Sequence, residues 1–206
     1  MNNILGIQRL VLASNNAGKL REFARLLSPL GIEVIPQREL GLDDAEETGL
    51  SFVENAILKA RHASAHTGLP ALADDSGLEV VALNGAPGIY SARYSGEGAT
   101  DERNNQLLLS ALSDFNDAQR AARYRCVLAL MRHASDPSPM LAEGEWHGRI
   151  LSAARGRGGF GYDPVFWVEE CQCSAAELSA ADKDERSHRA LATRRLLDKL
   201  YGAAGA

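Results

Sequence analysis

The chain has 206 residues, of which 45% are hydrophobic and 24% charged, ordinary values for a globular protein that exclude an intrinsically disordered one. Its 27 acidic and 22 basic residues give a net charge of -5, which argues against a general nucleic-acid-binding protein, since that class needs a basic surface. The net charge does not exclude a small anionic substrate, because a bound metal ion or a local positive pocket can make the electrostatic potential at a site positive.

Targeting and cysteine signals are sparse. Residues 1–10 lack the basic region and apolar stretch of a signal peptide, and no apolar run approaches the ~20 residues of a membrane span. The spacing of Cys126, Cys171 and Cys173 fits neither a disulfide framework nor a zinc site, so we interpret Cys126 as a core residue and the others as incidental. The sequence predicts a soluble cytoplasmic protein with one domain over residues 1–206, since no linker or repeat divides it.

The hydrophobic pattern predicts a mixture of strands and helices, an α/β chain. Short apolar runs bounded by turn residues predict strands, and apolar residues at helical spacing predict helices. In chain order we expect a strand at 9–13, a helix at 19–30, a strand at 32–36, a helix at 51–66, strands at 69–73 and 78–83, a helix at 100–112, strands at 123–131, 140–146 and 164–168, and a helix at 187–201. Ser51 and Glu54 form a capping-box pattern, and Gly31 and Gly68 are stop signals.

The helix expected at 51–66 has a polar side opposite its apolar one. The apolar side consists of Phe52, Val53, Ala56, Ile57, Ala60 and Ala63, and the polar side of Asn55, Lys59, His62 and His66. Two interpretations of the polar side stay open. It is either a solvated face or a surface from which Lys59 points at an anion.

Two adjacent acids, Asp74 and Asp75, follow the apolar run 69–73. Carboxylates that close a strand can project from the edge of a sheet, where one can ligate a hard cation and the other can orient a water. The same Asp-Asp-Ser-Gly sequence is typical of an ordinary turn, so this motif alone does not decide between the two.

A polar segment between the first strand and the first helix has the arrangement of an anion site. It consists of Ser14, Asn15, Asn16, Ala17, Gly18 and Lys19. Backbone N–H groups at a helix N-terminus and one lysine can bind phosphate. The segment is not a Walker A loop, since the required glycine and hydroxyl residues are missing. A capped helix start with a solvated lysine is the alternative.

Two further clusters lie in the last third of the chain. Glycines surround Phe160 and allow a close approach to a ligand, which suits base stacking, although a buried turn residue is the alternative. Ser187, His188 and Arg189 open the last helix, where they either bind a ligand or form a solvated first turn. Neither Ser14 nor Ser76 lies in a Gly-x-Ser-x-Gly elbow, which argues against a serine nucleophile.

All four clusters, in this order and spacing, resemble the inosine triphosphate pyrophosphatase family. The resemblance extends from Leu10 to about Leu200 and includes the segments 46–49, 54–56, 86–93 and 160–163. It implies an elongated, curved mixed sheet flanked by helices, with two lobes and a central cleft. It also implies hydrolysis of deaminated purine triphosphates (ITP, dITP and XTP) to the monophosphate and pyrophosphate, with Mg²⁺ as cofactor.

The resemblance further implies roles for individual residues. Asp75 is expected to be catalytic, and Glu47, Asp74 and Asp75 to form the Mg²⁺ site. The expected substrate-binding residues are Ser14, Asn15, Asn16, Ala17, Gly18, Lys19, Lys59, Ser76, Phe160, Gly161, Tyr162, Asp163, Lys183, His188 and Arg189. Phe160 would stack on the base, and the pocket for the base and sugar would be shaped by Asp163, Lys183, His188 and Arg189. A homodimer is expected, with Gly88–Tyr94 in its interface, and neither nucleic acid nor membrane is an expected partner.

Two other functions stay open from the sequence. One is a non-catalytic nucleotide sensor or RNA-binding module that uses the same phosphate loop. The clustered acids count against it. Carboxylates repel a polyphosphate, so a protein that only binds the nucleotide has no reason to gather them there. The other is a pyrophosphatase for different modified nucleotides, such as methylated pyrimidines.

Overall fold

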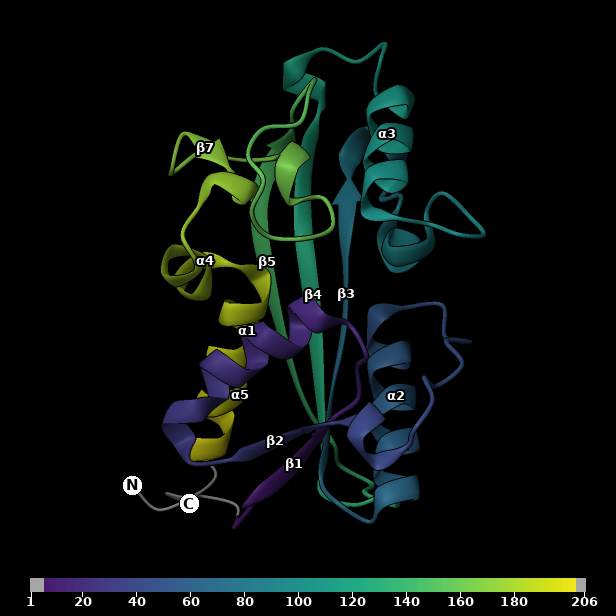
Figure 1. Cartoon of the computed structure of the whole chain (residues 1–206), viewed down its shortest axis with the longest axis vertical. Coiled ribbons are helices and arrows are strands. Elements are labelled where there is room, and N and C mark those ends of the chain that lie inside the picture. The colour runs from purple at the N-terminus through teal and green to yellow at the C-terminus, as the bar shows by residue number, and fades with distance from the viewer. Residues whose placement is uncertain (1–5, 203–206) are drawn as a thin grey trace. The chain divides into compact units, whose positions relative to one another are not determined.

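The computed structural model describes residues 6–202, and it separates into two compact units (Figure 1). The first unit contains the chain up to Asp75, Cys126–Gly144 and the chain from Arg189 onward. The second unit contains Ser76–Arg125 and Glu145–His188. In the described part of the chain, every helix is too short or too polar to cross a membrane. Residues 203–206, which the Ala-rich sequence predicts to be a loose tail, lie outside the described residues.

The strands form a seven-stranded mixed sheet in the order β2-β1-β3-β4-β5-β6-β7, which confirms the predicted α/β class. Its members are β1 (Arg9–Leu12), β2 (Glu33–Pro36), β3 (Ala71–Val80), β4 (Ala121–Met131), β5 (Met140–Ile150), β6 (Phe166–Val168) and β7 (Cys173–Ser174). β1 runs parallel to β2 and β3, while β6 runs antiparallel to β5 and β7.

The helices follow the predicted pattern with two differences. They are α1 (Ala17–Leu27), α2 (Phe52–Thr67), α3 (Asp101–Ala111), α4 (Ala180–Arg186) and α5 (His188–Gly202). α1 ends before the predicted residue 30, because Pro29 belongs to a short 3-10 turn that follows it. α4 was not predicted; its seven residues are too few for a hydrophobic period to stand out.

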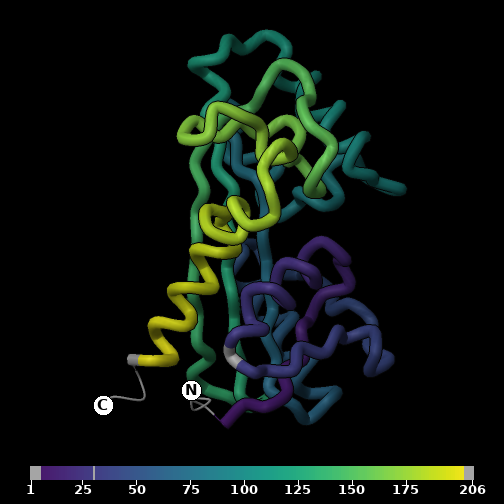
Figure 2. Tube along the Cα trace, turned by 60° about the vertical axis from the view of Figure 1, so that its left-hand side comes forward, coloured from purple at the N-terminus to yellow at the C-terminus, as the bar shows by residue number. Residues whose placement is uncertain are grey.

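In the first unit, helices cover both faces of the strands. Side chains of β1, β3, β4 and β5 that point to one face form a core with α1 and α5, and this core includes Leu12, Phe23, Leu72, Leu128 and Leu196. α2 lies on the other side of these strands (Figure 1). Figure 2 shows α5, in yellow, along the green strands. Because side chains alternate along a strand, neighbouring residues of β3 meet different helices.

In the second unit, a separate core joins α3 to the strands. It includes Leu78 and Val80 of β3, Leu108 of α3, and Tyr162 and Phe166. Within this unit β5 is longer than predicted and continues through Gly148. A Cβ at Gly148 would lie 2.3 Å from the Trp167 carbonyl oxygen, so the glycine there allows close strand contact and is not a strand end.

The largest difference from the sequence prediction is in β3. Two strands were expected, with Asp74 and Asp75 at the end of the first, but a single ten-residue strand contains both acids. The strand continues through Gly77, where the Gly88 carbonyl oxygen approaches closely. A Cβ at this position would lie 2.2 Å from that oxygen, so only glycine leaves room for it. Asp74 and Asp75 therefore lie mid-strand, on opposite faces, and do not project together from a sheet edge.

Candidate active site

The expected phosphate loop connects β1 to α1. Asn16 is the N-cap of α1, and its side-chain oxygen accepts a hydrogen bond from the Lys19 backbone N–H at 3.0 Å. Ser14 Oγ accepts one from the Asn16 N–H at 3.2 Å. Asn15 Nδ2 donates to Asp44 Oδ1 at 3.0 Å, which links the loop to the acid-rich segment 42–49. The loop therefore presents the N-terminus of an 11-residue helix, the arrangement that favours an anion.

Asp74 lies in a buried charge network with α1 and α5. Its Oδ2 accepts a hydrogen bond from Arg189 Nε at 2.5 Å, and Arg189 also pairs with Glu22 of α1. On its other oxygen, Asp74 receives the Lys19 ammonium at 3.4 Å and the Cys126 thiol at 3.7 Å. Both oxygens of Asp74 are thus occupied by partners from its own face of the sheet.

Burial and charge act in opposite directions on the two cations of this network. Arg189 is only 2% exposed; its burial disfavours the charged form, but Asp74 and Glu22 outweigh that effect and raise its pKa. For Lys19 burial dominates and lowers the pKa, with Asp74 opposing it. Arg189 therefore stays charged, and a further anion bound near Lys19 would stabilise the charged form of its ammonium group.

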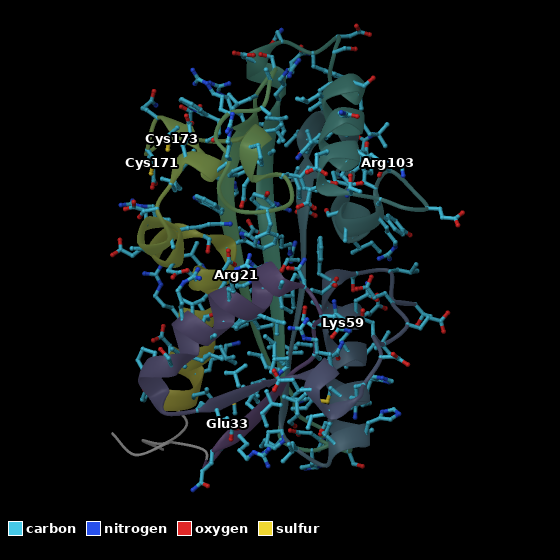
Figure 3. All side chains as sticks on the ribbon, in the orientation of Figure 1. Arg21, Glu33, Lys59, Arg103, Cys171 and Cys173 are labelled. Carbon is cyan, nitrogen blue, oxygen red and sulfur yellow. The ribbon has the colours of Figure 1, made fainter. Side chains whose placement is uncertain are left out.

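Asp75 faces the other side of β3 and meets Lys59 of α2. Figure 3 labels Lys59 on this helix. Lys59 Nζ lies 2.5 Å from Asp75 Oδ1 and 3.1 Å from Glu47 Oε1, so one ammonium bridges two carboxylates. Burial raises the pKa of Asp75, and Lys59 opposes the shift. Burial also disfavours the charge on Lys59, but Asp75 and Glu47 prevail and raise the pKa of Lys59. The second oxygen, Asp75 Oδ2, is buried and has no hydrogen-bond partner among residues 6–202.

The polar side predicted for the second helix is not one surface. Lys59 points into the acids with its side chain 12% exposed, so the solvated-face interpretation is wrong for this residue. Asn55 is fully buried, and its Oδ1 accepts a hydrogen bond from the Gly49 N–H at 2.9 Å. Only His66, which is exposed, keeps the solvated position expected of the group.

The glycine-rich segment around Phe160 lies in the second unit, where Asp163 organises it. Asp163 Oδ2 accepts hydrogen bonds from the Phe160 N–H at 2.9 Å and from Lys183 Nζ at 2.6 Å. The Lys183 ammonium lies 4.7 Å from the centre of the Phe160 ring, a cation–π distance. Phe160 itself is only half-buried, which argues against the buried-turn alternative.

His188 also belongs to this cluster. Its ring stacks on Tyr124 at 4.7 Å between centroids with 8° between the planes, and the Tyr124 hydroxyl donates to Asp163 Oδ1 at 3.3 Å. His188 is buried, so the interpretation of Ser187-His188-Arg189 as a solvated first turn is wrong. Tyr162 is buried, with its hydroxyl donating to the Ser91 carbonyl at 2.7 Å.

The structure thus divides the predicted site residues into two clusters, each inside one unit. The first combines Lys19, Lys59, Glu47, Asp74, Asp75 and Arg189. The second combines Phe160, Asp163, Lys183 and His188 with Tyr124. Arg189 was expected in the pocket of the second cluster, but its partners belong to the first.

Sequence reasoning missed Glu22 and Tyr124. Glu22 lies one helical turn after Lys19, so its position on the same face as the loop lysine was a readable signal. Tyr124 had no local signal, because its partners Asp163 and His188 are distant in sequence.

Comparisons with known proteins agree on one family. Residues 10–199 match the Ham1 family. The dITP/XTP pyrophosphatase of Thioalkalivibrio sulfidiphilus is 60% identical over 94% of this chain and 99% of that protein. That of Escherichia coli O157:H7 is 58% identical over 94% of this chain and 98% of that protein. The solved structure of a HAM1 protein from Coxiella burnetii superposes with a TM-score of 0.85 at 49% identity, covering 97% of this chain and 100% of that chain. The chain belongs to the Ham1 family.

Proposed function

We propose that this protein hydrolyses deaminated purine nucleoside triphosphates (ITP, dITP and XTP) to the monophosphate and pyrophosphate, removing them from the nucleotide pool. The carrying observation is that relatives 55–60% identical over more than nine-tenths of the chain are named dITP/XTP pyrophosphatases. The buried pair of Lys59 and Asp75 supports it, because a nucleotide-binding module without catalysis has no need of a buried acid there. The expectation of one domain over residues 1–206 stays part of this proposal.

In this proposal the first cluster binds the triphosphate. The loop 14–19 offers the N-terminus of α1, and Lys19 and Lys59 supply positive charge. Phosphoryl transfer depends mainly on positioning and on charge neutralisation, so two lysines and a helix N-terminus suit it. Ser76, which follows Asp75 in β3, contacts the same substrate.

A divalent metal fits part of the predicted acidic set. Asp75 has a buried oxygen with no partner in the described chain, and Glu47 shares a cation with it, so these two would hold Mg²⁺. Both oxygens of Asp74 already bind cationic partners or the Cys126 thiol, so we assign Asp74 to positioning. Among residues 6–202 no three His, Cys, Asp or Glu side chains are grouped to hold an ion, and Mg²⁺ commonly takes its other ligands from phosphate and water.

Asp75 receives the proton of the attacking water in this scheme. The water oxygen adds to the α-phosphorus, the bond from that phosphorus to the bridging oxygen breaks, and pyrophosphate leaves. Lys59 keeps the Asp75 carboxylate oriented through its 2.5 Å contact with Oδ1. Oδ2 has two lone pairs, so it could ligate Mg²⁺ with one and accept the water proton with the other. When bound, Mg²⁺ would neutralise charge on the phosphate oxygens.

The second cluster recognises the base. Phe160 stacks on the purine, and stacking accepts any base, so selectivity must come from hydrogen bonds. Inosine carries an acceptor at position 6 and a proton on N1, whereas adenine has the reverse pattern. A pocket that pairs with hypoxanthine leaves buried groups unpaired when adenine enters. The buried polar groups Asp163, Lys183 and His188 are the described candidates for this pairing.

A nucleotide panel tests the function. Pyrophosphate release is measured with ITP, dITP, XTP, GTP, ATP and a methylated pyrimidine triphosphate, with Mg²⁺ and with a chelator. We expect ITP and XTP to exceed ATP in kcat/KM by roughly 10⁴, and Asp75→Asn to lose turnover while it stays folded. Asp114→Asn, an exposed acid, is the matched control. Equal hydrolysis of ATP and ITP, or release of orthophosphate alone, rejects the proposal.

We also propose a homodimer in which the segment Gly88–Tyr94 takes part. Tyr90 in this segment is 53% exposed, with the Arg93 guanidinium 5.2 Å from the centre of its ring, which gives an exposed aromatic anchor suited to an interface. Light scattering should report twice the chain mass, and Tyr90→Glu should lower it. A monomer for the parent protein at micromolar concentration contradicts this proposal.

A further inference from the structure

The backbone on both sides of Phe160 is in a conformation that few residues adopt. Gly159 and Gly161 have φ of 71° and 63°, in the left-handed region. A loop that relies on two such glycines has many alternative conformations when it is not held, because glycine populates most of backbone space. The direction of the Phe160 ring therefore depends on what fixes its neighbouring peptide groups.

Both peptide groups of Gly161 are held by α3. Its N–H donates to Asp101 Oδ2 at 2.6 Å, and its carbonyl accepts from Asn105 Nδ2 at 2.9 Å. Asp101 and Asn105 are four residues apart, so they lie on one face of α3. The two side chains thus bind the donor and the acceptor of a single residue of the loop.

On the other side of Phe160, the loop is fixed by Asp163. Its Oδ2 accepts the Phe160 N–H at 2.9 Å, and a Cβ on Gly159 would lie 2.0 Å from this oxygen. The ring is therefore held from two directions, by α3 through Gly161 and by Asp163 through its own amide. Of these two supports, only Asp163 is one of the residues predicted to shape the base pocket.

The contacts to Gly161 are not needed to dock α3. The helix already buries Leu108 completely, Leu112 at its C-cap is also buried, and Asn104 Nδ2 donates to the Ser91 and Ala92 carbonyls. Asp101 is exposed and makes its short bond only to the loop. A side chain that adds little to the core but fixes a glycine-rich loop has a positioning task.

We infer that Asp101 and Asn105 are positioning residues that hold Phe160 ready to stack on the purine base. This inference rests on the proposed function, because it needs Phe160 to contact the base. Preorganisation of the ring removes an ordering cost that binding would otherwise carry. The effect falls equally on all purine substrates, since stacking does not distinguish them.

The test measures KM and kcat for ITP and GTP in Asp101→Ala, Asn105→Ala and Asn105→Asp. The last variant keeps the size of the side chain but sets an acceptor against the Gly161 carbonyl. We expect KM to rise roughly tenfold for both nucleotides in all three, with a smaller change in kcat. Asp101→Asn, which keeps an acceptor for the Gly161 N–H, should restore most of the affinity.

Glu102→Ala is the matched control, since it removes another acid from the first turn of α3. It loses the same interaction with the helix dipole but none with Gly161, so KM should stay at the parent value. Each variant is also made in a Phe160→Ala background. If Asp101 and Asn105 act through the ring, their substitutions should change KM by less than about twofold there.

Three outcomes overturn the inference. The first is a full additional loss in the Phe160→Ala background, which would make the roles of Asp101 and Asn105 independent of the ring. The second is a Glu102→Ala defect equal to that of Asp101→Ala. The third is an unchanged KM for ITP in Phe160→Ala, which would show that Phe160 does not stack on the purine base. Only the third removes the base-stacking part of the proposed function, so the two failures can be told apart.

Discussion

Removal of the Arg189 guanidinium should unfold the first unit more readily, because it leaves two buried acids without a cation. Arg189 is 2% exposed and pairs with Asp74 and Glu22, whose side chains are 0% and 6% exposed. Breaking a buried ion pair from one side costs roughly 3–5 kcal/mol, since the remaining charge stays desolvated. For a chain of 206 residues this corresponds to a fall in Tm of roughly 6–20 °C.

Thermal denaturation of Arg189→Met measures this loss, since methionine keeps much of the apolar stem. Arg195→Met on the exposed side of the same helix is the control and should change stability by less than about 0.5 kcal/mol. Adding Glu22→Gln and Asp74→Asn to Arg189→Met should recover much of the loss, because the stranded charges are then absent. An unpaired buried carboxylate binds a proton more readily when folded than when unfolded. The loss of stability in Arg189→Met, relative to the parent protein, should therefore become smaller as pH falls from about 8 to about 5.

Three results would refute this reasoning. If Arg189→Met keeps the parent Tm, the network does not stabilise the fold. If it keeps the Tm and also narrows the gap between ITP and ATP, the arginine serves the base, as the family resemblance implied. A loss of stability that the neutralised triple variant does not recover would point to packing of the stem and not to charge.

Three further predictions concern other sites. Asp136→Asn should destabilise the protein by about 1–3 kcal/mol at neutral pH, because hydrogen bonds from Arg132 hold the pKa of Asp136 well below its usual range. In thermal melts the difference from the parent should begin to shrink as pH falls below about 4 and should disappear only in stronger acid, where the folded parent protein also protonates this carboxyl. Lys59→Met should lower kcat/KM for ITP by roughly 10² or more while circular dichroism stays native, because it exposes two carboxylates to the substrate. Gly159→Ala should lower Tm more than Gly161→Ala. Both glycines have positive φ, but only a Cβ on Gly159 meets another atom, Asp163 Oδ2, at 2.0 Å. Equal losses of Tm would show that this contact does not cause the difference.

Local signals predicted the elements that local physics determines. Ser51 is the N-cap of α2 and Gly68 ends it with φ of 68°, as the capping pattern indicated. The end of β1 and the start of α1 also follow from short-range rules, since Asn16 caps the helix through its own side chain. The conformation of the expected phosphate loop could be predicted for this reason: its contacts with α1 span only a few residues.

Long-range contacts explain what the sequence did not reveal. Asp-Asp-Ser-Gly has turn chemistry, yet β3 continues through it, because neighbouring strands and the backbone of Gly88 determine its course. Arg189 and Glu22 are 167 positions apart, so no spacing rule could pair them. Asn55 carries a polar side chain on a helix and is nevertheless fully buried, since its Oδ1 accepts a hydrogen bond from the backbone N–H of Gly49 in the preceding loop.

The adjacency of Asp74 and Asp75 in sequence suggested a shared task, but the geometry of a strand argues the opposite. Successive side chains on a strand point to opposite faces, so Asp74 must meet α1 and α5 while Asp75 must meet α2. The partners follow this rule: Arg189 and Lys19 bind Asp74, whereas Lys59 binds Asp75. One acid ties three elements of the first unit together, and its neighbour keeps an oxygen without a partner in the described chain. The ion pairs on one face of β3 therefore hold in place the strand that carries, on its other face, the carboxylate we propose as catalytic.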